Sequence, residues 1–244
     1  YLKLQMKMVE SDKNVFQNFE EKRNIGENDS YICSLIRNDS IDEFIIHVNK
    51  TNYNLKSKIP QSFFETNPYL IQNNPTLIEY AAFFGSIQIL RYLMNNDITL
   101  TESLWLYAIH SKNPEIIEFL EENEITPTDE SYEECFLEAI KCHHNDIAEY
   151  IKDNWLDKDV INLEKVQKIP TRIILNSLQY HNFKFVEGLP ADYIIYFACK
   201  YDCLSFVDNL KDSNIETINK EINEATPLSL AAEENYTDMI NLIF

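Results

Sequence analysis

The stretch TPLSLAA, residues Thr226–Ala232, decides the fold class of this chain. It is followed by Asn235, by the apolar pair Met239-Ile240 and by Ile243. The pair and the residue after it have the spacing i, i+1, i+4, which places all three on one face of a helix. The segment therefore predicts a short helix, a tight turn and a second helix that buries one apolar stripe.

The same frame recurs upstream when Ala231 is taken as an anchor. Successive anchors lie 33, 21, 38, 31 and 27 residues apart, and each is Ala or Ser, as expected where a neighbouring helix packs closely against the backbone. An apolar pair begins eight residues after each anchor, and a further apolar residue stands twelve after it. Because one helix pair cannot bury its apolar faces alone, this periodicity predicts a stack of repeats. The anchors are Ala81, Ala108, Ala139, Ser177, Ala198 and Ala231.

The turn between the two helices lies four residues after each anchor. We expect a left-handed backbone there, the conformation that ends many helices and that Gly, Asn, Asp and His adopt most readily. Lys112 fits this expectation poorly, and we expect Pro114 to fix the start of the helix that follows it. The column reads Gly85, Lys112, His143, His181, Asp202 and Asn235.

TPLSLAA resembles the consensus of ankyrin repeats, TPLHxAA, followed by a glycine, an Ile-Val pair and a leucine. Three further runs are similar to a large family of divergent ankyrin proteins of parasitic protists, whose upstream part is a domain of unknown function. The runs are LIEYAAFFGSIQIL (77–90), SLWLYAIH (103–110) and EAIKCHHNDIAEYI (138–151). The resemblance implies an all-α, ankyrin-type helix-turn-helix solenoid of about six to seven divergent repeats. It implies no catalytic residue.

The frame predicts the following organisation. The interval between anchors is short after Ser177 and long before it, which predicts that the helix pair anchored at Ser177, the middle pair, is distorted. The apolar run that ends at Phe244 suggests that the stack of repeats continues beyond this chain. We expect short helical turns in 59–74. The expected parts are a helical cap (1–29), a divergent first repeat with a connecting segment (30–74), three repeats (75–155), a distorted repeat with an insertion (156–190) and two repeats, the last truncated (191–244).

Composition excludes several classes of function. Three glycines are too few for a phosphate-binding loop, and no Ser-His-Asp order or HExxH run is present, so we expect no enzyme and no cofactor. Five cysteines without a CxxC favour reduced thiols in the cytoplasm or nucleus, and no segment is apolar enough for membrane insertion. The formal net charge is −19, with 16 acidic and 4 basic residues in 101–160, which argues against nucleic acid as a partner.

One cluster could bind a metal: Cys135, Cys142, His143 and His144. A zinc site needs about four nitrogen or sulfur ligands that converge. In the repeat frame, however, Cys135 and Cys142 fall on apolar columns and His143 on the turn, which favours a structural role. Trp105 falls on a core column, and His110 on a mixed column that we expect to be exposed or half-exposed.

We therefore predict a non-catalytic scaffold that binds a protein on the loops and first helices of the solenoid. Negative charge at Glu121, Glu122 and Glu124 is disfavoured by the helix dipole, so these residues are either simply solvated or kept for a basic partner. A metal-binding or redox module using the Cys/His cluster, or a targeting segment of a larger enzyme, are the alternatives. The candidate partner-binding residues are Asn96, Asp97, Glu121, Glu122, Glu124 and Asp129.

Overall fold

The computed structural model describes residues 19–111, 113–128, 131–156, 168–186, 190–211, 220–222 and 224–243. Regular structure in these ranges is helical, and extended backbone pairs only at the isolated bridges Lys58–Thr76 and Ile222–Ala225. The all-α class predicted from the sequence is thus confirmed. None of the described helices is long and apolar enough to cross a membrane. The chain divides into two compact units, Tyr1–Thr126 and Pro127–Phe244.

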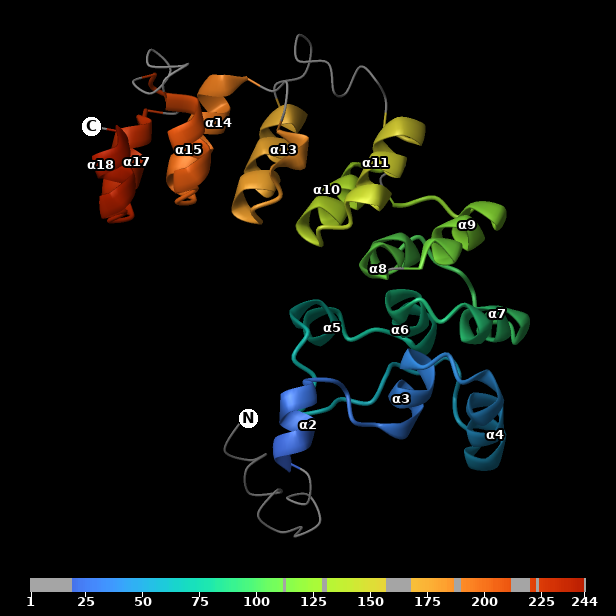
Figure 1. The fold of residues 1–244 in the computed structure, drawn as a ribbon. Coiled ribbons are helices and arrows are strands. Elements are labelled where there is room, and N and C mark those ends of the chain that lie inside the picture. Colours follow the sequence, from blue (N-terminus) through green and yellow to red (C-terminus); the bar gives the residue numbers. More distant parts are fainter. Residues whose placement is uncertain are drawn as a thin grey trace. The chain divides into compact units, whose positions relative to one another are not determined.

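The first unit, drawn in blue to green in Figure 1, contains three consecutive helix pairs, α3 with α4, α6 with α7 and α8 with α9, and also the helices α2 and α5 among its described residues. The first helices of the pairs form one row, in which α3 packs on α6 and α6 on α8, and the second helix α4 packs on α7. The helices are α2 (Phe19–Ile25), α3 (Tyr31–Arg37), α4 (Ile41–Thr51), α5 (Pro68–Asn73), α6 (Leu77–Phe84), α7 (Ile87–Asn95), α8 (Leu104–His110) and α9 (Pro114–Glu122).

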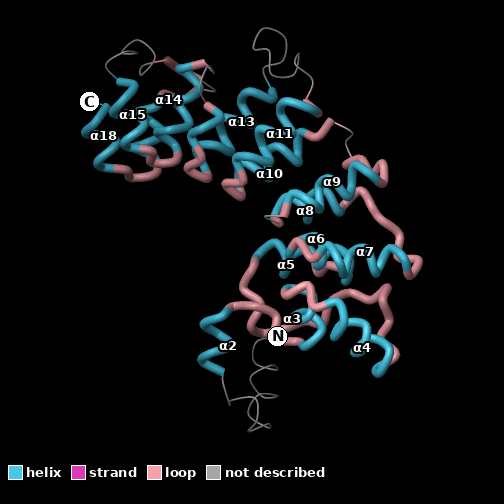
Figure 2. Tube along the Cα trace, turned by 45° about the vertical axis from the view of Figure 1, so that its right-hand side comes forward, coloured by secondary structure: helices cyan, strands magenta, loops and turns pink. Residues whose placement is uncertain are grey.

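The second unit repeats this arrangement, and Figure 2 shows short turns that join α10 to α11 and α14 to α15. Here α10, α13, α14 and α17 pack in succession, while α15 packs on α18. The elements are α10 (Glu133–Lys141), α11 (Asn145–Asn154), α13 (Lys168–Gln179), the 3-10 turn η1 (Phe183–Phe185), α14 (Ala191–Lys200), α15 (Leu204–Lys211), α17 (Pro227–Glu233) and α18 (Thr237–Ile243).

All six predicted anchors are fully buried, at 0% exposure. A small residue is needed at this position because the first helices of adjacent pairs approach each other there. The expectation that Trp105 belongs to the core is also confirmed, since its indole is fully buried and donates a hydrogen bond to the Ile125 carbonyl at 2.6 Å.

The turn column is confirmed wherever it is described. The backbone φ is 74° at Gly85, 57° at His143, 54° at His181, 54° at Asp202 and 59° at Asn235. In these five turns the anchor carbonyl also accepts the N–H of the residue five positions later, at 2.7 to 2.9 Å in four of them and 3.0 Å in the other. This is the Schellman arrangement, which satisfies the carbonyls left unpaired at a helix end.

The turn of the third pair differs from the others. Lys112 lies outside the described residues, and the Ala108 carbonyl accepts the N–H of Ser111 instead. The next helix, α9, begins at Pro114 as expected, with the Asn113 side chain capping it at the Glu115 N–H. Proline is tolerated at this first position because its missing N–H would have no partner within the helix.

Two parts of the frame are less regular than the rest. In the middle pair, which the short interval after Ser177 predicts to be distorted, the second helix of the frame is only the 3-10 turn η1, because the 21-residue interval leaves too little chain for a full helix. Leu189 lies outside the described residues. In 59–74 only Pro68–Asn73 is helical, and the backbone before it is irregular. Residues 1–18, in the predicted cap, and 157–167, in the predicted insertion, also lie outside the described residues.

Candidate functional site

The predicted partner-binding residues of the first unit gather at the ends of its second helices, α7 and α9. Asn96 follows the last residue of α7, and its side-chain amide donates to the Tyr92 carbonyl at 2.8 Å. Asp97 comes next with a left-handed backbone, φ 60°. The N–H of Ile98 closes this helix end by donating to the Leu93 carbonyl at 3.2 Å.

The end of α9 is built in the same way. Asn123 donates its amide to the Phe119 carbonyl at 2.7 Å, and Glu124 has φ 56°. The N–H of Ile125 donates to the Leu120 carbonyl at 3.0 Å. Asp97 and Glu124 thus occupy the position where glycine is usually preferred, and each acidic side chain is strained there relative to glycine.

Acidic side chains gather in the C-terminal part of α9. Glu118, Glu122 and Glu124 are exposed, and none of them forms an ion pair with another described residue. The helix dipole adds partial negative charge at this end. Glu121 is half-buried and engaged with the rest of the protein, while Asp129 lies outside the described residues. We call Asn96, Asp97, Glu118, Glu121, Glu122 and Glu124 the acidic helix-end surface.

The structure does not bring the four candidate metal ligands together. Cys135 is fully buried inside α10, and His143 is exposed in the turn, with its Nε2 atom 2.8 Å from the Tyr180 carbonyl oxygen. Burial raises the pKa of the Cys142 thiol to about 12, so the thiolate that zinc requires is disfavoured. No three of these four residues place their ligand atoms within 4.8 Å of one another.

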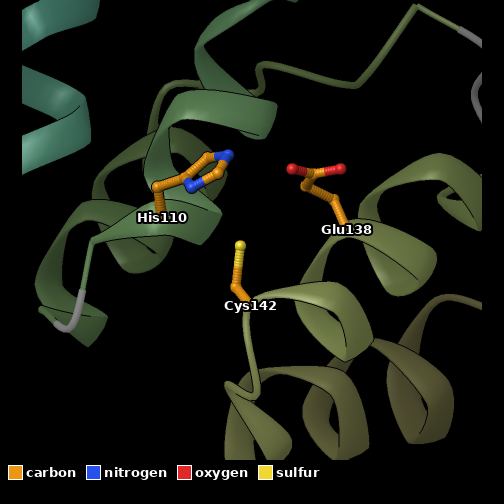
Figure 3. Close-up of side chains that lie close together, drawn as sticks. All are labelled: His110, Glu138 and Cys142. Carbon is orange, nitrogen blue, oxygen red and sulfur yellow. The ribbon is translucent and has the colours of Figure 1, made fainter. Parts of the chain in front are cut away.

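Several other cysteine and histidine side chains lie in packed surroundings. In Figure 3, Glu138 projects from α10 and Cys142 from the residue directly after that helix. His110, at the end of α8 in the first unit, is half-buried, and its ring lies 4.3 Å from the Tyr69 ring and 4.8 Å from the Phe83 ring between centroids. Burial raises the pKa of Cys199 to about 12 and that of Cys203 to about 11, which makes both poor nucleophiles.

Sequence reasoning missed a set of side chains that link neighbouring helix pairs. They stand five residues after an anchor, directly after the turn. Ser86 donates its hydroxyl to the Ile36 carbonyl, Asn113 its amide to the Gly85 carbonyl at 2.9 Å, and Asn182 its amide to the Ile140 carbonyl at 2.8 Å. The signal was present in the repeat frame, where this column carries a short polar side chain in each of these three repeats.

A second missed feature is a polar cluster around Arg37 in the first unit. One guanidinium nitrogen donates to the Asn28 carbonyl at 2.9 Å and to the Tyr80 hydroxyl at 2.8 Å, while Nε lies 2.8 Å from the Glu27 carboxylate. Burial raises the pKa of Tyr80. This cluster joins α3 and α6 to the segment before α3 and depends on contacts far apart in the sequence.

No family model matches this chain, and no curated protein matches it.

Proposed function

We propose that this chain is a divergent ankyrin-type solenoid that acts as a non-catalytic scaffold and binds a basic protein through the acidic helix-end surface. The observation that carries the proposal is the repeated turn. Five helix pairs combine a fully buried small anchor with a left-handed residue four positions later, as the ankyrin-like frame requires. In repeat arrays of this kind, core columns maintain the stack and exposed positions are free to vary for binding.

The charge distribution supports the choice of a basic partner. Negative charge at the C-terminal end of a helix is unfavourable for the helix itself, by about 0.3 to 1 kcal/mol for each residue. Glu122 lies in the last turn of α9, and α9 has no basic residue in that turn to compensate. A binding role accounts for acidic residues at a place where stability alone favours lysine or arginine.

The test is affinity capture of partner proteins on the immobilised chain, comparing wild type with the double variant Glu118→Lys/Glu122→Lys. Both side chains are exposed and one helical turn apart. The helix dipole favours lysine over glutamate at residue 122, in the last turn of α9, and lysine at residue 118 has a helix propensity similar to that of glutamate. A loss of binding is therefore not explained by loss of the helix. Glu124 is left unchanged because its backbone is left-handed, so a substitution there would also change the strain at the helix end.

The control is Glu233→Lys, which makes one charge reversal of the same kind at the exposed C-terminal end of α17. We expect wild type and the control to retain the same partners and the double variant to lose them, with capture falling as salt is raised. Equal capture by all three proteins, unaffected by salt, would contradict the proposal.

A further inference from the structure

The first unit contains a cavity of about 250 Å³ next to the acidic helix-end surface. It lies where the segment after α4, the start of α6 and the loop after α7 meet. The part of that loop that lines the cavity begins directly after Asp97, a member of the acidic helix-end surface. A partner that contacts Asp97 is therefore placed beside this cavity.

Hydrogen bonds hold the walls of the cavity in place. The N–H of Leu77 donates to the Ser57 carbonyl at 3.3 Å, which ties the segment after α4 to the start of α6. The Ser103 hydroxyl donates to Oε1 of Glu79 at 2.8 Å, which ties the end of the loop after α7 to the same helix. The cavity is therefore preformed, as is usual for binding sites.

The ionisable side chains of the lining disfavour a cationic occupant. The carboxylate of Glu79 is already engaged, since Oε2 accepts both the N–H and the hydroxyl of Thr76 at 2.8 Å and Oε1 accepts from Ser103. Lys56 is exposed and forms no ion pair with another described residue. A cation inside the cavity would face the like charge of Lys56, which is costly.

The rest of the lining suits an apolar side chain. Ile78 is 3% exposed, and Leu55 and Ile98 are half-buried. An apolar cavity of about 150 Å³ is large enough to hold benzene. The cavity of about 250 Å³ therefore has room for one large aliphatic or aromatic side chain.

The rim of the cavity is negatively charged. Asp97 and Glu102 flank the stretch 98–101, and both are exposed and form no ion pair with another described residue. Such a rim favours basic residues on either side of the occupant. A second copy of this chain, with its formal net charge of −19, would bring more negative charge to the rim and is disfavoured.

We propose that this cavity receives an apolar side chain of the basic partner, such as leucine, which has lysine or arginine on both sides of it in the partner's sequence. The apolar side chain would cover Leu55 and Ile98, and the flanking cations would lie at Asp97 and Glu102. Exposed ion pairs add little affinity, whereas an apolar anchor in a pocket adds more. The inference rests on the proposed function and adds the residue that anchors the partner.

The test is a titration of the full chain with the acetylated and amidated peptide Gly-Lys-Leu-Lys-Gly, followed by amide chemical shifts up to millimolar peptide. Two matched peptides carry alanine in place of leucine or glutamine in place of both lysines. We expect shifts concentrated in 55–56, 76–79 and 98–102, with binding at least about threefold weaker for either matched peptide. Ile98→Ser should weaken binding of the leucine peptide by a similar factor, whereas the control Ile46→Ser, at a 64% exposed position on α4, should bind as wild type does.

The inference is overturned if the leucine peptide causes no shifts in these segments, or if either matched peptide binds as tightly as it does. Shifts of the same amides when the chain alone is concentrated would show that a second copy occupies the cavity, which also contradicts the inference. A thermal melt shows whether Ile98→Ser is folded; if it is not, the three peptides on wild type decide. Failure here is separable from failure of the proposed function, because Glu118→Lys/Glu122→Lys changes no residue of the cavity.

Discussion

The anchor residues offer a direct test of the argument that the stack needs a small apolar residue at this position, because one of the six anchors carries a hydroxyl group. Ser177 stands where the other repeats have alanine, is fully buried in α13, and its Oγ atom has no hydrogen-bond partner among the described residues. Ser86 is its natural contrast. It is 1% exposed, but its hydroxyl donates to the Ile36 carbonyl. The two serines are equally buried and differ in whether the hydroxyl is paired.

We expect Ser177→Ala to stabilise the chain by about 1 to 2 kcal/mol. A buried hydroxyl without a partner costs about 1 to 3 kcal/mol, and alanine adds about 0.5 kcal/mol of helix propensity. The void left by one oxygen atom offsets part of this gain, by less than about 1 kcal/mol. Ser86→Ala should have the opposite sign and destabilise by about 1 kcal/mol, because it removes a hydrogen bond.

Urea unfolding followed by circular dichroism measures both changes, with thermal melting as a second readout. The midpoint should rise for Ser177→Ala and fall for Ser86→Ala at constant m-value, and the Ser177→Ala melting temperature should rise by about 3 to 8 °C. The reasoning is refuted if Ser177→Ala is neutral or destabilising at an unchanged m-value. In that case, the hydroxyl has a partner or its volume is essential to the packing.

Three further changes follow from the same geometry. Gly85→Ala should lower the free energy of unfolding in urea by about 2 kcal/mol or more, since φ at Gly85 is 74° and a Cβ there would lie 2.8 Å from a side-chain carbon of the next repeat. Glu124→Gly, at φ 56°, should raise the free energy of unfolding by about 0.5 to 1 kcal/mol. Equal effects of the two substitutions would contradict the turn assignment. Asn182→Ala should lower the free energy of unfolding by about 2 kcal/mol, because the buried amide links two helix pairs, and a neutral result would show that the link is dispensable. Burial raises the pKa of Cys199 to about 12 and that of Cys203 to about 11, so both thiols stay protonated in the folded chain at pH values where thiols of the unfolded chain, with a pKa near 9.0, ionise. These thiols should therefore leave the free energy of unfolding unchanged below about pH 9 and lower it as the pH rises towards 12. In urea unfolding of wild type and Cys199→Ala across this range, the free energy of unfolding should fall more steeply with pH for wild type.

The repeat frame could be predicted because it rests on local chemistry. A small anchor and a residue tolerant of left-handed backbone four positions later lie within one helix end, so their meaning does not depend on distant contacts. In the middle pair the apolar spacing around Phe185 indicates a second helix, but the short interval after Ser177 leaves too little chain to form one. Periodicity reports which face is buried, not whether enough residues remain to complete the turn.

The candidate site was less predictable because its contacts join residues far apart in the chain. The charge of Glu122 and Glu124 is evident from the sequence, but the left-handed backbone of Glu124 depends on how α9 ends. Arg37 meets Tyr80 across 43 positions, and Ser103 meets Glu79 across 24. No short-range pattern encodes such contacts, although the polar column that includes Asn182 could have been found from the repeat frame.

The central claim, a scaffold that recognises a basic partner through the acidic helix-end surface, is tested most directly by a binding isotherm. The captured partner is titrated against wild type, Glu118→Lys/Glu122→Lys and Glu233→Lys at several salt concentrations. We predict that the double variant binds about three- to tenfold more weakly at low salt, that this difference shrinks as salt increases, and that the control matches wild type. Identical isotherms for all three proteins at every salt concentration would contradict the account.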